Sequence, residues 1–287
     1  MKTVVVTGAT SGIGYAVCGE LCSRGYGIIG VGHSEKNCQD ALEKLQQRFP
    51  EASMVFFCGD LMQQREVRRV SLAMKNHIDS TCGGHLYALI NNAGCVRSWY
   101  STTEDGYEQQ FALNHLAGFL MTQILLPCLI HGSAEGGGRV IMTSSGSHKG
   151  ISIHWNDPML RKKYHPLIAY KQSKLCNLLF AFTLNERFAK LGIHAYAVDP
   201  GLVKTDIGNK QTGSLVSYIW SLRKRHGVLP EIPAKTYAWL CDQEPVPTGL
   251  YYYQCKESAY SRQVNQANAL RLFNMSRQLC ELPNGRY

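Results

Sequence analysis

Short apolar runs alternate with longer amphipathic stretches along most of this chain. The short runs are rich in β-branched and aromatic residues, as in buried strands, and the longer stretches repeat apolar residues every three or four positions, as in helices. Such alternation indicates βαβ units and a parallel sheet covered on both faces. We predict strands at residues 3–7, 27–32, 53–58, 86–91, 139–143, 194–198 and 249–252. We predict helices at residues 13–23, 39–48, 66–77, 108–130, 168–191, 233–241 and 259–280.

The first predicted strand leads directly into a glycine-rich turn. Gly8, Gly12 and Gly14 follow Thr7, and an apolar helical pattern begins at once behind them. Glycines let a backbone turn tightly and approach a diphosphate, while the start of a helix offers free N–H groups and the positive end of its dipole. The turn therefore predicts a nucleotide site, with a plain βα turn as the alternative. Its GxxxGxG spacing differs from the usual dinucleotide fingerprint.

Tyr170 and Lys174 lie four residues apart in a predicted helix, which places them one above the other on its surface. A phenol titrates near pH ~10, and a neighbouring ammonium favours its ionised form and lowers that value. The pair therefore indicates an acid/base group that exchanges a proton with a substrate oxygen. An accidental pair on a surface helix is the alternative.

Further motifs occur in a fixed order along the chain. They are Asn91-Asn92-Ala93-Gly94, Asn114, Ser144-Ser145 and Asp199-Pro200-Gly201. With the glycine turn and the Tyr/Lys pair, this set resembles the short-chain dehydrogenase/reductase family over nearly the whole chain. The residues around Asn114 and Tyr170, and the long gap after Ser145, are similar to the retinol dehydrogenase branch. The resemblance implies an α/β, Rossmann-type doubly wound parallel sheet of about seven strands in three α/β/α layers.

The resemblance also implies a catalytic set. Tyr170 would give the proton in reduction and take it in oxidation, and Lys174 would lower the Tyr170 pKa and hold the nicotinamide ribose. Ser145 would bind the substrate oxygen, with Ser144 as the alternative for this role. The Asn114 backbone would help hold a water that links Lys174 to solvent, and the alternative is a core asparagine that kinks its helix.

Cofactor contacts are implied at the ends of several predicted strands. An acidic residue at the end of the second strand would take a ribose 2′-hydroxyl, and a basic one a 2′-phosphate. Here His33-Ser34-Glu35-Lys36 offers no Asp, so we expect NADP(H) rather than NAD(H). For Asp60, a helix N-cap is an equal alternative. The implied contacts are Gly8, Thr10, Ser11, Gly12, Ile13, Gly14, His33, Ser34, Asp60, Leu61, Asn91, Ala93, Gly94, Tyr170, Lys174, Pro200, Gly201, Val203 and Thr205.

Composition is compatible with one globular domain over residues 1–287. Apolar residues make up 45% of the 287, enough for a sizeable core. Residues 206–232 are expected to form a lid, and their apolar, aromatic part at 215–220 favours a lipophilic substrate such as a steroid, retinoid, polyprenoid or aromatic ketone. Placement of these side chains in the core is the alternative. The insertion at 146–166, with Trp155 and Tyr164, should border the pocket mouth.

Net charge and cysteine usage limit the kinds of partner that we expect. The net charge of +9 admits peripheral contact with an anionic membrane, but the basic runs lack the aromatic residues of a single-strand binder, so we expect no nucleic acid. Eleven cysteines without zinc-like spacing indicate reduced thiols and no metal. We recognise no signal segment and no run of about 20 apolar residues, so a soluble, cytoplasmic protein is expected.

Helices at 111–130 and 175–184 are apolar on almost every side, as at a subunit interface. A homodimer or homotetramer is therefore expected, with deep burial in a monomer as the alternative. The predicted activity is that of an NAD(P)(H)-dependent oxidoreductase that interconverts a carbonyl and an alcohol. The alternatives are an epimerase or double-bond reductase on the same scaffold, and a non-catalytic nucleotide sensor.

Overall fold

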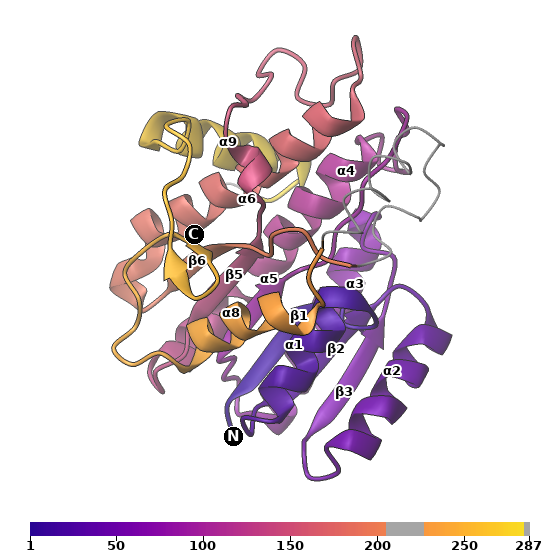
Figure 1. Cartoon of the computed structure of the whole chain (residues 1–287), viewed down its shortest axis with the longest axis vertical. Helices are drawn as coiled ribbons and strands as arrows, with labels where there is room; N and C mark the ends of the chain where they lie inside the picture. Colours follow the sequence, from indigo (N-terminus) through magenta and orange to yellow (C-terminus); the bar gives the residue numbers. More distant parts are fainter. Residues whose placement is uncertain (205–226, 284–287) are drawn as a thin grey trace.

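One mixed sheet runs through the protein, for which a computed structural model describes residues 1–204 and 227–283. Its strands lie in the order β3-β2-β1-β4-β5-β6-β7-β8 (Figure 1). Neighbouring strands pair in parallel from β3 to β7, and β8 is antiparallel to β7. The strands are β1 (Thr3–Thr7), β2 (Gly27–Gly32), β3 (Met54–Cys58), β4 (Ala88–Asn91), β5 (Arg139–Thr143), β6 (His194–Asp199), β7 (Tyr251–Tyr253) and β8 (Lys256–Glu257).

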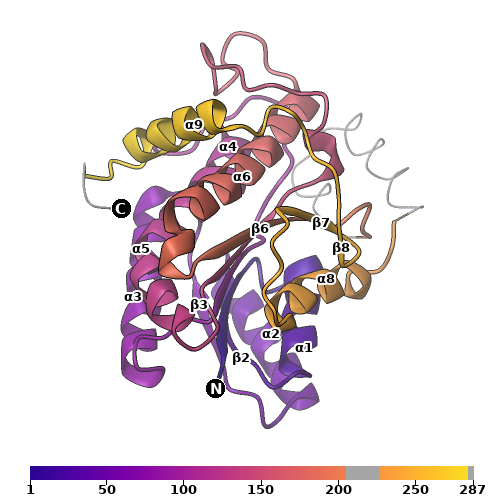
Figure 2. The same ribbon diagram turned by 90° about the vertical axis from the view of Figure 1, so that its left-hand side faces the viewer.

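Helices cover both faces of this sheet (Figure 2). One face carries α1 (Gly12–Cys22), α2 (Glu35–Arg48) and α8 (Glu231–Asp242). The other carries α3 (Gln64–Thr81), α5 (Ala117–Ser133) and α6 (Pro166–Phe188), and α9 (Gln266–Leu279) packs on α6. Short helices α4 (Gln109–Phe111), η1 (Ala112–Leu116), η2 (Gly146–His148) and η3 (Ala189–Leu191) complete the described elements. The predicted three-layer α/β/α fold is confirmed.

The apolar core is divided by the sheet into two layers. In β1, Val4 and Val6 pack towards α1 and α8, whereas Val5 packs towards α3, α5 and α6. Successive side chains of a strand point to opposite faces, so a strand with helices on both sides must be apolar at every position. This requirement explains the unbroken Val4-Val5-Val6 run.

The strand order reverses between β1 and β4. From β1 the chain proceeds outwards through β2 to β3 and then returns to β4 on the other side of β1. In open α/β sheets a ligand binds beyond the carboxyl ends of the strands at such a reversal. The glycine turn after β1 and residues 91–94 after β4 meet at this point.

Several element boundaries differ from those predicted. The sheet has eight strands rather than about seven, because residues 254 and 255 adopt positive φ values and turn the chain into β8. The last helix begins at Gln266 and not at residue 259, because the Asn265 side chain accepts a hydrogen bond from the Asn268 N–H at 3.0 Å and caps it. The helix predicted at 108–130 is divided into α4, the π-helix η1 and α5.

The apolar faces of α5 and α6 are covered within one chain. Phe119 of α5 packs on Phe180 of α6 with ring centroids 4.8 Å apart, and on Phe273 of α9 at 5.5 Å. His115 of η1 lies 2.9 Å from the Ser276 hydroxyl of α9. Deep burial, the alternative given above, accounts for the apolarity of these described residues, and a dimer or tetramer stays a prediction.

One continuous helical stretch, Gln109–Ser133, is long and apolar enough to cross a membrane by length and composition. Asn114, His115 and Gln123 interrupt the apolar pattern of this stretch, so it contains no unbroken apolar run of about 20 residues. Most of this helix is buried inside the protein, as for the core helix of a folded domain.

Candidate active site

The glycine turn between β1 and α1 is too crowded for side chains at two of its positions. A Cβ on Gly14 would lie 2.2 Å from the Gly8 carbonyl oxygen, and a Cβ on Gly8 would lie 3.1 Å from Asn92 Nδ2. Gly8 and Gly12 also have φ values of +67° and +55°, which favour glycine. Ser11, the N-cap of α1, makes no side-chain capping bond, so the first N–H groups of α1 are left for an anion. This cradle fits a dinucleotide diphosphate.

Thr7 and Asn92 lock this turn to the end of β4, a role that the sequence analysis missed. The Thr7 hydroxyl accepts hydrogen bonds from the N–H groups of Asn92 and Ala93, each at 2.9 Å. Asn92 Nδ2 donates to the Thr7 carbonyl oxygen at 3.0 Å. The signal available in the sequence was a polar residue at the last position of each strand or directly after it. The lock fixes the point where the strand order reverses.

Asn91 is turned away from the cleft. Its Nδ2 donates to the Thr122 hydroxyl at 3.0 Å, and the side chain packs against Gly118 of α5, where a Cβ would lie 3.1 Å from it. Its Oδ1 is buried without a hydrogen-bond partner among the described residues. Any contact of Asn91 with a nucleotide would therefore have to come from its backbone.

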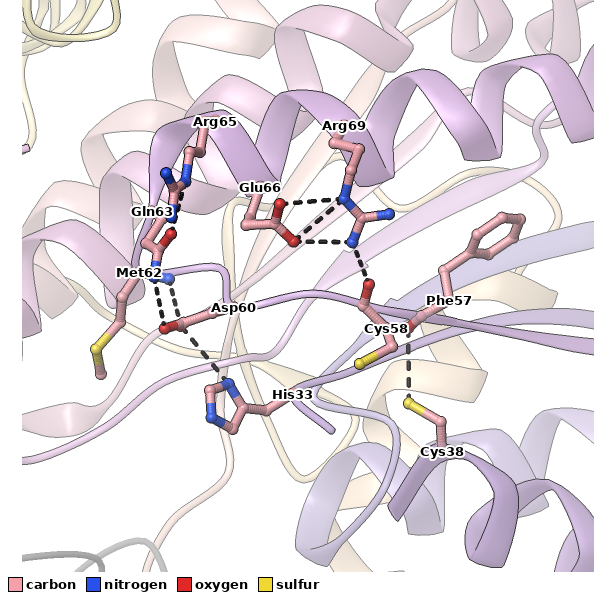
Figure 3. Close-up of polar contacts among 10 residues, drawn as sticks. All are labelled: His33, Cys38, Phe57, Cys58, Asp60, Met62, Gln63, Arg65, Glu66 and Arg69. Carbon is pink, nitrogen blue, oxygen red and sulfur yellow. Dashed lines mark hydrogen bonds and ion pairs between the residues drawn. The ribbon is translucent and has the colours of Figure 1, made fainter. Parts of the chain in front are cut away.

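The ends of β2 and β3 bring together residues predicted to contact the adenosine (Figure 3). His33 is well exposed, and its Nδ1 lies 3.6 Å from Asp60 Oδ1. Asp60 Oδ1 accepts from the Met62 N–H at 3.0 Å, so Asp60 closes a turn, whereas the N-cap of α3 is Gln63. The alternative of Asp60 as the helix N-cap is thus wrong.

Ser34 has a structural task at the same edge. It is the N-cap of α2, and its hydroxyl accepts from the Asn37 N–H at 3.4 Å. Lys36 is exposed and its ammonium pairs with Asp40 at 2.7 Å. His33 is therefore the basic side chain of this group that lies nearest to the strand ends.

Lys174 of α6 is almost completely buried, with 3% of its surface exposed. Its Nζ donates to the carbonyl oxygen of Thr143, the last residue of β5, at 3.1 Å, and lies 5.4 Å from the centre of the Tyr170 ring. Burial lowers the pKa of Lys174 to about 8, and this lowering is opposed by Cys95 and Asp199. Near pH 7 most of the ammonium stays charged and faces the half-buried Tyr170.

Ser144 and Ser145 differ in whether their hydroxyl groups can still donate a hydrogen bond to a ligand. Ser144 is fully buried, and its hydroxyl donates to the Lys174 carbonyl oxygen at 2.8 Å. The Ser145 side chain is half-buried and accepts a hydrogen bond from the Ser147 N–H at 3.2 Å. The Ser145 hydroxyl hydrogen is therefore available to a substrate oxygen, which favours Ser145 over Ser144.

Asn114 ties three elements together from the middle of the π-helix η1. Its Oδ1 accepts from the Cys95 N–H at 2.7 Å, and its Nδ2 donates to the Cys95 carbonyl oxygen and to the Ser173 hydroxyl, both at 3.0 Å. The clamp joins the loop after β4 to α6, one residue from Lys174. A π-helical turn inside an α-helix is a common feature of functional sites.

Residues beyond β6 border a cavity of about 190 Å³, lined in part by Pro200, Gly201 and Ile232. Val203 bridges to Val228, so the residues on either side of the stretch 205–226 are joined. That stretch, with Thr205 and most of the predicted lid at 206–232, lies outside the described residues.

The insertion at 146–166 is held by polar and ring contacts. Tyr164 accepts from Gln110 Nε2 at 2.8 Å and donates to the Arg97 carbonyl oxygen at 3.2 Å, while the Arg271 guanidinium lies 4.5 Å above the Trp155 ring. Both aromatic residues named in the sequence analysis thus have structural contacts.

Comparison with known proteins gives consistent matches. The protein-family model described as short chain dehydrogenase matches residues 2–214 of this chain. Retinol dehydrogenase 12 of Mus musculus is 33% identical, over 98% of this chain and 86% of its own length. Polyprenol dehydrogenase of Homo sapiens is 32% identical, over 72% of this chain and 62% of its own length. A short-chain dehydrogenase from Sphingobium yanoikuyae in complex with NADPH is 18% identical, covers 100% of this chain and 98% of its own, and superposes with a TM-score of 0.66.

The expected cytoplasmic location is overturned by these relatives. They are dehydrogenases named for retinol and polyprenol, which are apolar lipids that partition out of water and into membranes. The cytoplasmic expectation also rested on finding no segment able to span a membrane, whereas Gln109–Ser133 is long and apolar enough by length and composition. The cytoplasmic assignment is therefore withdrawn.

Proposed function

We propose that this chain, which belongs to the short-chain dehydrogenase family, uses NADP(H) to interconvert a carbonyl and an alcohol on a lipophilic substrate, with Tyr170 as the general acid and base. The family membership makes it an NAD(P)-dependent oxidoreductase. The observation that carries the residue assignment is the buried Lys174 ammonium, 5.4 Å from the Tyr170 ring.

Each residue has a distinct task in this proposal. A bound nicotinamide supplies the hydride, and the glycine turn after β1 is the part of the chain that would hold its diphosphate. Tyr170 gives a proton to the substrate oxygen in reduction and takes it back in oxidation. The Lys174 charge stabilises the phenolate that forms, and the Ser145 hydroxyl donates to the substrate oxygen as negative charge develops there. Asn114 holds the loop after β4 against α6, so that Tyr170 and Lys174 keep their places.

A lipophilic substrate is supported by the relatives and by the surface near the cavity. The relatives are named for retinol and polyprenol. Apolar Leu202, Val228 and Ile232 line the cavity beyond β6 and are exposed. We expect the enzyme to consume NADPH with retinoid, polyprenoid, steroid or aromatic carbonyls, followed as loss of absorbance near ~340 nm. A preference for small charged sugars would contradict this substrate class, and products other than the alcohol would indicate epimerisation or double-bond reduction.

His33 is proposed to favour NADP(H) over NAD(H). It is exposed at the end of β2, where a basic group can face a 2′-phosphate. We expect His33→Asp to weaken NADPH binding at least about tenfold while NADH binding is kept or improved, because the new carboxylate repels the phosphate and accepts from a ribose hydroxyl. Fluorescence titration with both nucleotides measures this change.

The control is Lys36→Gln, since the Lys36 ammonium is already held by Asp40. It should alter the ratio of the two affinities much less than His33→Asp does. Equal NADPH affinity in His33→Asp and wild type would remove His33 from the cofactor site.

A further inference from the structure

A polar network lies behind Ser145, among residues that the proposed reaction does not use. Asp199 ends β6, and its Oδ2 accepts a hydrogen bond from the Tyr251 hydroxyl of β7 at 2.9 Å. Its Oδ1 accepts from the Gly201 N–H at 2.8 Å. A Cβ on Gly146 would lie 2.9 Å from Asp199 Oδ2, so the carboxylate packs against the residue that follows Ser145. The carboxylate is thus fixed on three sides.

His148 continues this network to Ser145 itself. The His148 ring is fully buried, and its Nδ1 lies 2.7 Å from the Ser145 carbonyl oxygen, which can only accept. Its Nε2 accepts from the Ser261 N–H at 3.2 Å. These two bonds together require the neutral ring with its proton on Nδ1. Burial also lowers the pKa of His148, in agreement with a neutral ring.

Tyr251 connects the two halves. Its ring meets the His148 ring edge-to-face with centroids 4.8 Å apart, while its hydroxyl is bound to Asp199. The ammonium of Lys149 lies 6.0 Å from the centre of the same ring. The contacts therefore run without a gap from the Asp199 carboxylate, through Tyr251 and His148, to the backbone of Ser145.

The Asp199 charge acts on titratable groups from four surrounding elements. It raises the pKa of Lys174 on α6, against the larger effect of burial. It also contributes to raising the pKa of Tyr251 on β7 and of Tyr237 on α8, and it opposes the lowering of the His148 pKa on η2. Lys149 also faces this network, over the Tyr251 ring, and Cys95 acts on the Lys174 pKa in the same direction as Asp199.

We propose that Asp199 is a positioning residue of the active site. Its carboxylate, bound to Tyr251 and Gly201, fixes the Ser145 turn, and its negative charge helps keep the Lys174 ammonium protonated. This inference rests on the proposed function for its catalytic consequence. The position of Asp199 near Lys174 does not, because Val198, the residue before Asp199, pairs in register with Thr143, whose carbonyl oxygen accepts from Lys174 Nζ. Burial brings the pKa of Lys174 down to about 8, and the negative charge of Asp199 opposes this lowering, so that the ammonium keeps its proton to higher pH.

The first test is the pH profile of kcat/KM for carbonyl reduction, compared between wild type and Asp199→Asn. Removing the negative charge lets burial lower the Lys174 pKa further. The alkaline limb, at which the ammonium loses its proton, therefore moves with it. We expect the limb to shift to lower pH by about half a unit or more. An unshifted limb would overturn the electrostatic part of the proposal.

Tyr251→Phe separates position from charge. This variant keeps the carboxylate and the ring contact with His148 but loses the hydrogen bond to Asp199. We expect kcat to fall because the Ser145 turn loosens, while the alkaline limb stays close to that of wild type. Unchanged kcat in Tyr251→Phe would overturn the positioning part.

Stability provides a readout that needs no turnover. The pKa of Lys174 is about 8 in the folded protein and 10.5 without burial, so between these values the unfolded chain binds more protons. The Lys174 contribution to the free energy of unfolding therefore rises as the pH increases from about 8 to 10.5. Buried thiols act in the opposite direction, so the quantity to measure is the difference between wild type and Lys174→Met by urea unfolding.

We expect this difference to begin changing at lower pH in the Asp199→Asn background. The same onset in both backgrounds would contradict a coupling between Asp199 and Lys174. If wild type turned over no carbonyl, the proposed function would fail, and this measurement would still decide the coupling.

Discussion

Tyr170→Phe is expected to lower turnover by about 10²–10⁴-fold, the usual contribution of a positioned acid or base. Phenylalanine fills the same space but has no hydroxyl to exchange a proton with the substrate oxygen. The Lys174 ammonium would then stand beside a ring that cannot ionise. Steady-state kinetics with NADPH and a carbonyl substrate measure the loss, and nucleotide titration should show that NADPH binding is largely kept.

Tyr164→Phe is the matched control, because it removes a hydroxyl that has structural partners. The Tyr164 hydroxyl bonds to Gln110 and to the Arg97 carbonyl oxygen, so its loss should lower stability and leave turnover of the folded enzyme near that of wild type. A Tyr170→Phe enzyme within about threefold of wild-type kcat would exclude Tyr170 as the acid and base.

Asn114→Ala is expected to lower the free energy of unfolding by about 2–5 kcal/mol. It removes a clamp on both backbone groups of Cys95 and on the Ser173 hydroxyl, and each buried group left unpaired costs about 1–3 kcal/mol. Turnover of the remaining folded enzyme should fall as well, because the clamp holds the loop after β4 to α6 beside Lys174. Urea unfolding and kcat of the folded fraction measure the two effects.

Asn185 offers a close structural match far from the site. Its side chain accepts from the Ala195 N–H at 2.7 Å and donates to the Ala195 carbonyl oxygen at 2.8 Å, which is the same two-point clamp. Asn185 lies about four helical turns beyond Tyr170 on α6. Asn185→Ala should therefore destabilise the protein without lowering kcat of the folded fraction. Equal kcat in the two variants would show that Asn114 is a structural asparagine only.

The sheet could be predicted because its signal is local. Parallel strands such as β1 are buried on both faces, so an apolar run such as Val4-Val5-Val6 predicts a strand even when the neighbouring strands are not known. Helix starts depended on single caps: Ser34 starts α2 four residues earlier than predicted, and Asn265 starts α9 seven residues later. The two-residue β8 was missed, because so short an antiparallel strand leaves no periodic pattern.

The candidate site was only partly visible in the sequence. Motif positions placed Tyr170 and Lys174 correctly on one helix face, but the direction of a side chain after a strand depends on the pleat. The Asn91 side chain, for example, bonds to Thr122 in the core, while its neighbour Asn92 holds the glycine turn, so the cofactor contact of Asn91 stays a prediction for its backbone. His148, Asp199 and Tyr251 are far apart in sequence, so only the tertiary structure reveals their network.

Backbone hydrogen bonds at Val228 hold together the two ends of the chain on either side of residues 205–226. Lys204 N–H donates to the Val228 carbonyl oxygen at 2.9 Å, and Val228 N–H donates to the Leu202 carbonyl oxygen at 2.8 Å. When the two ends of a loop are held together in this way, the entropic cost of closing the loop depends only weakly on its length. A change in the number of residues between these two paired ends is therefore expected to cost little stability, because the hydrogen bonds at Val228 keep the ends in place.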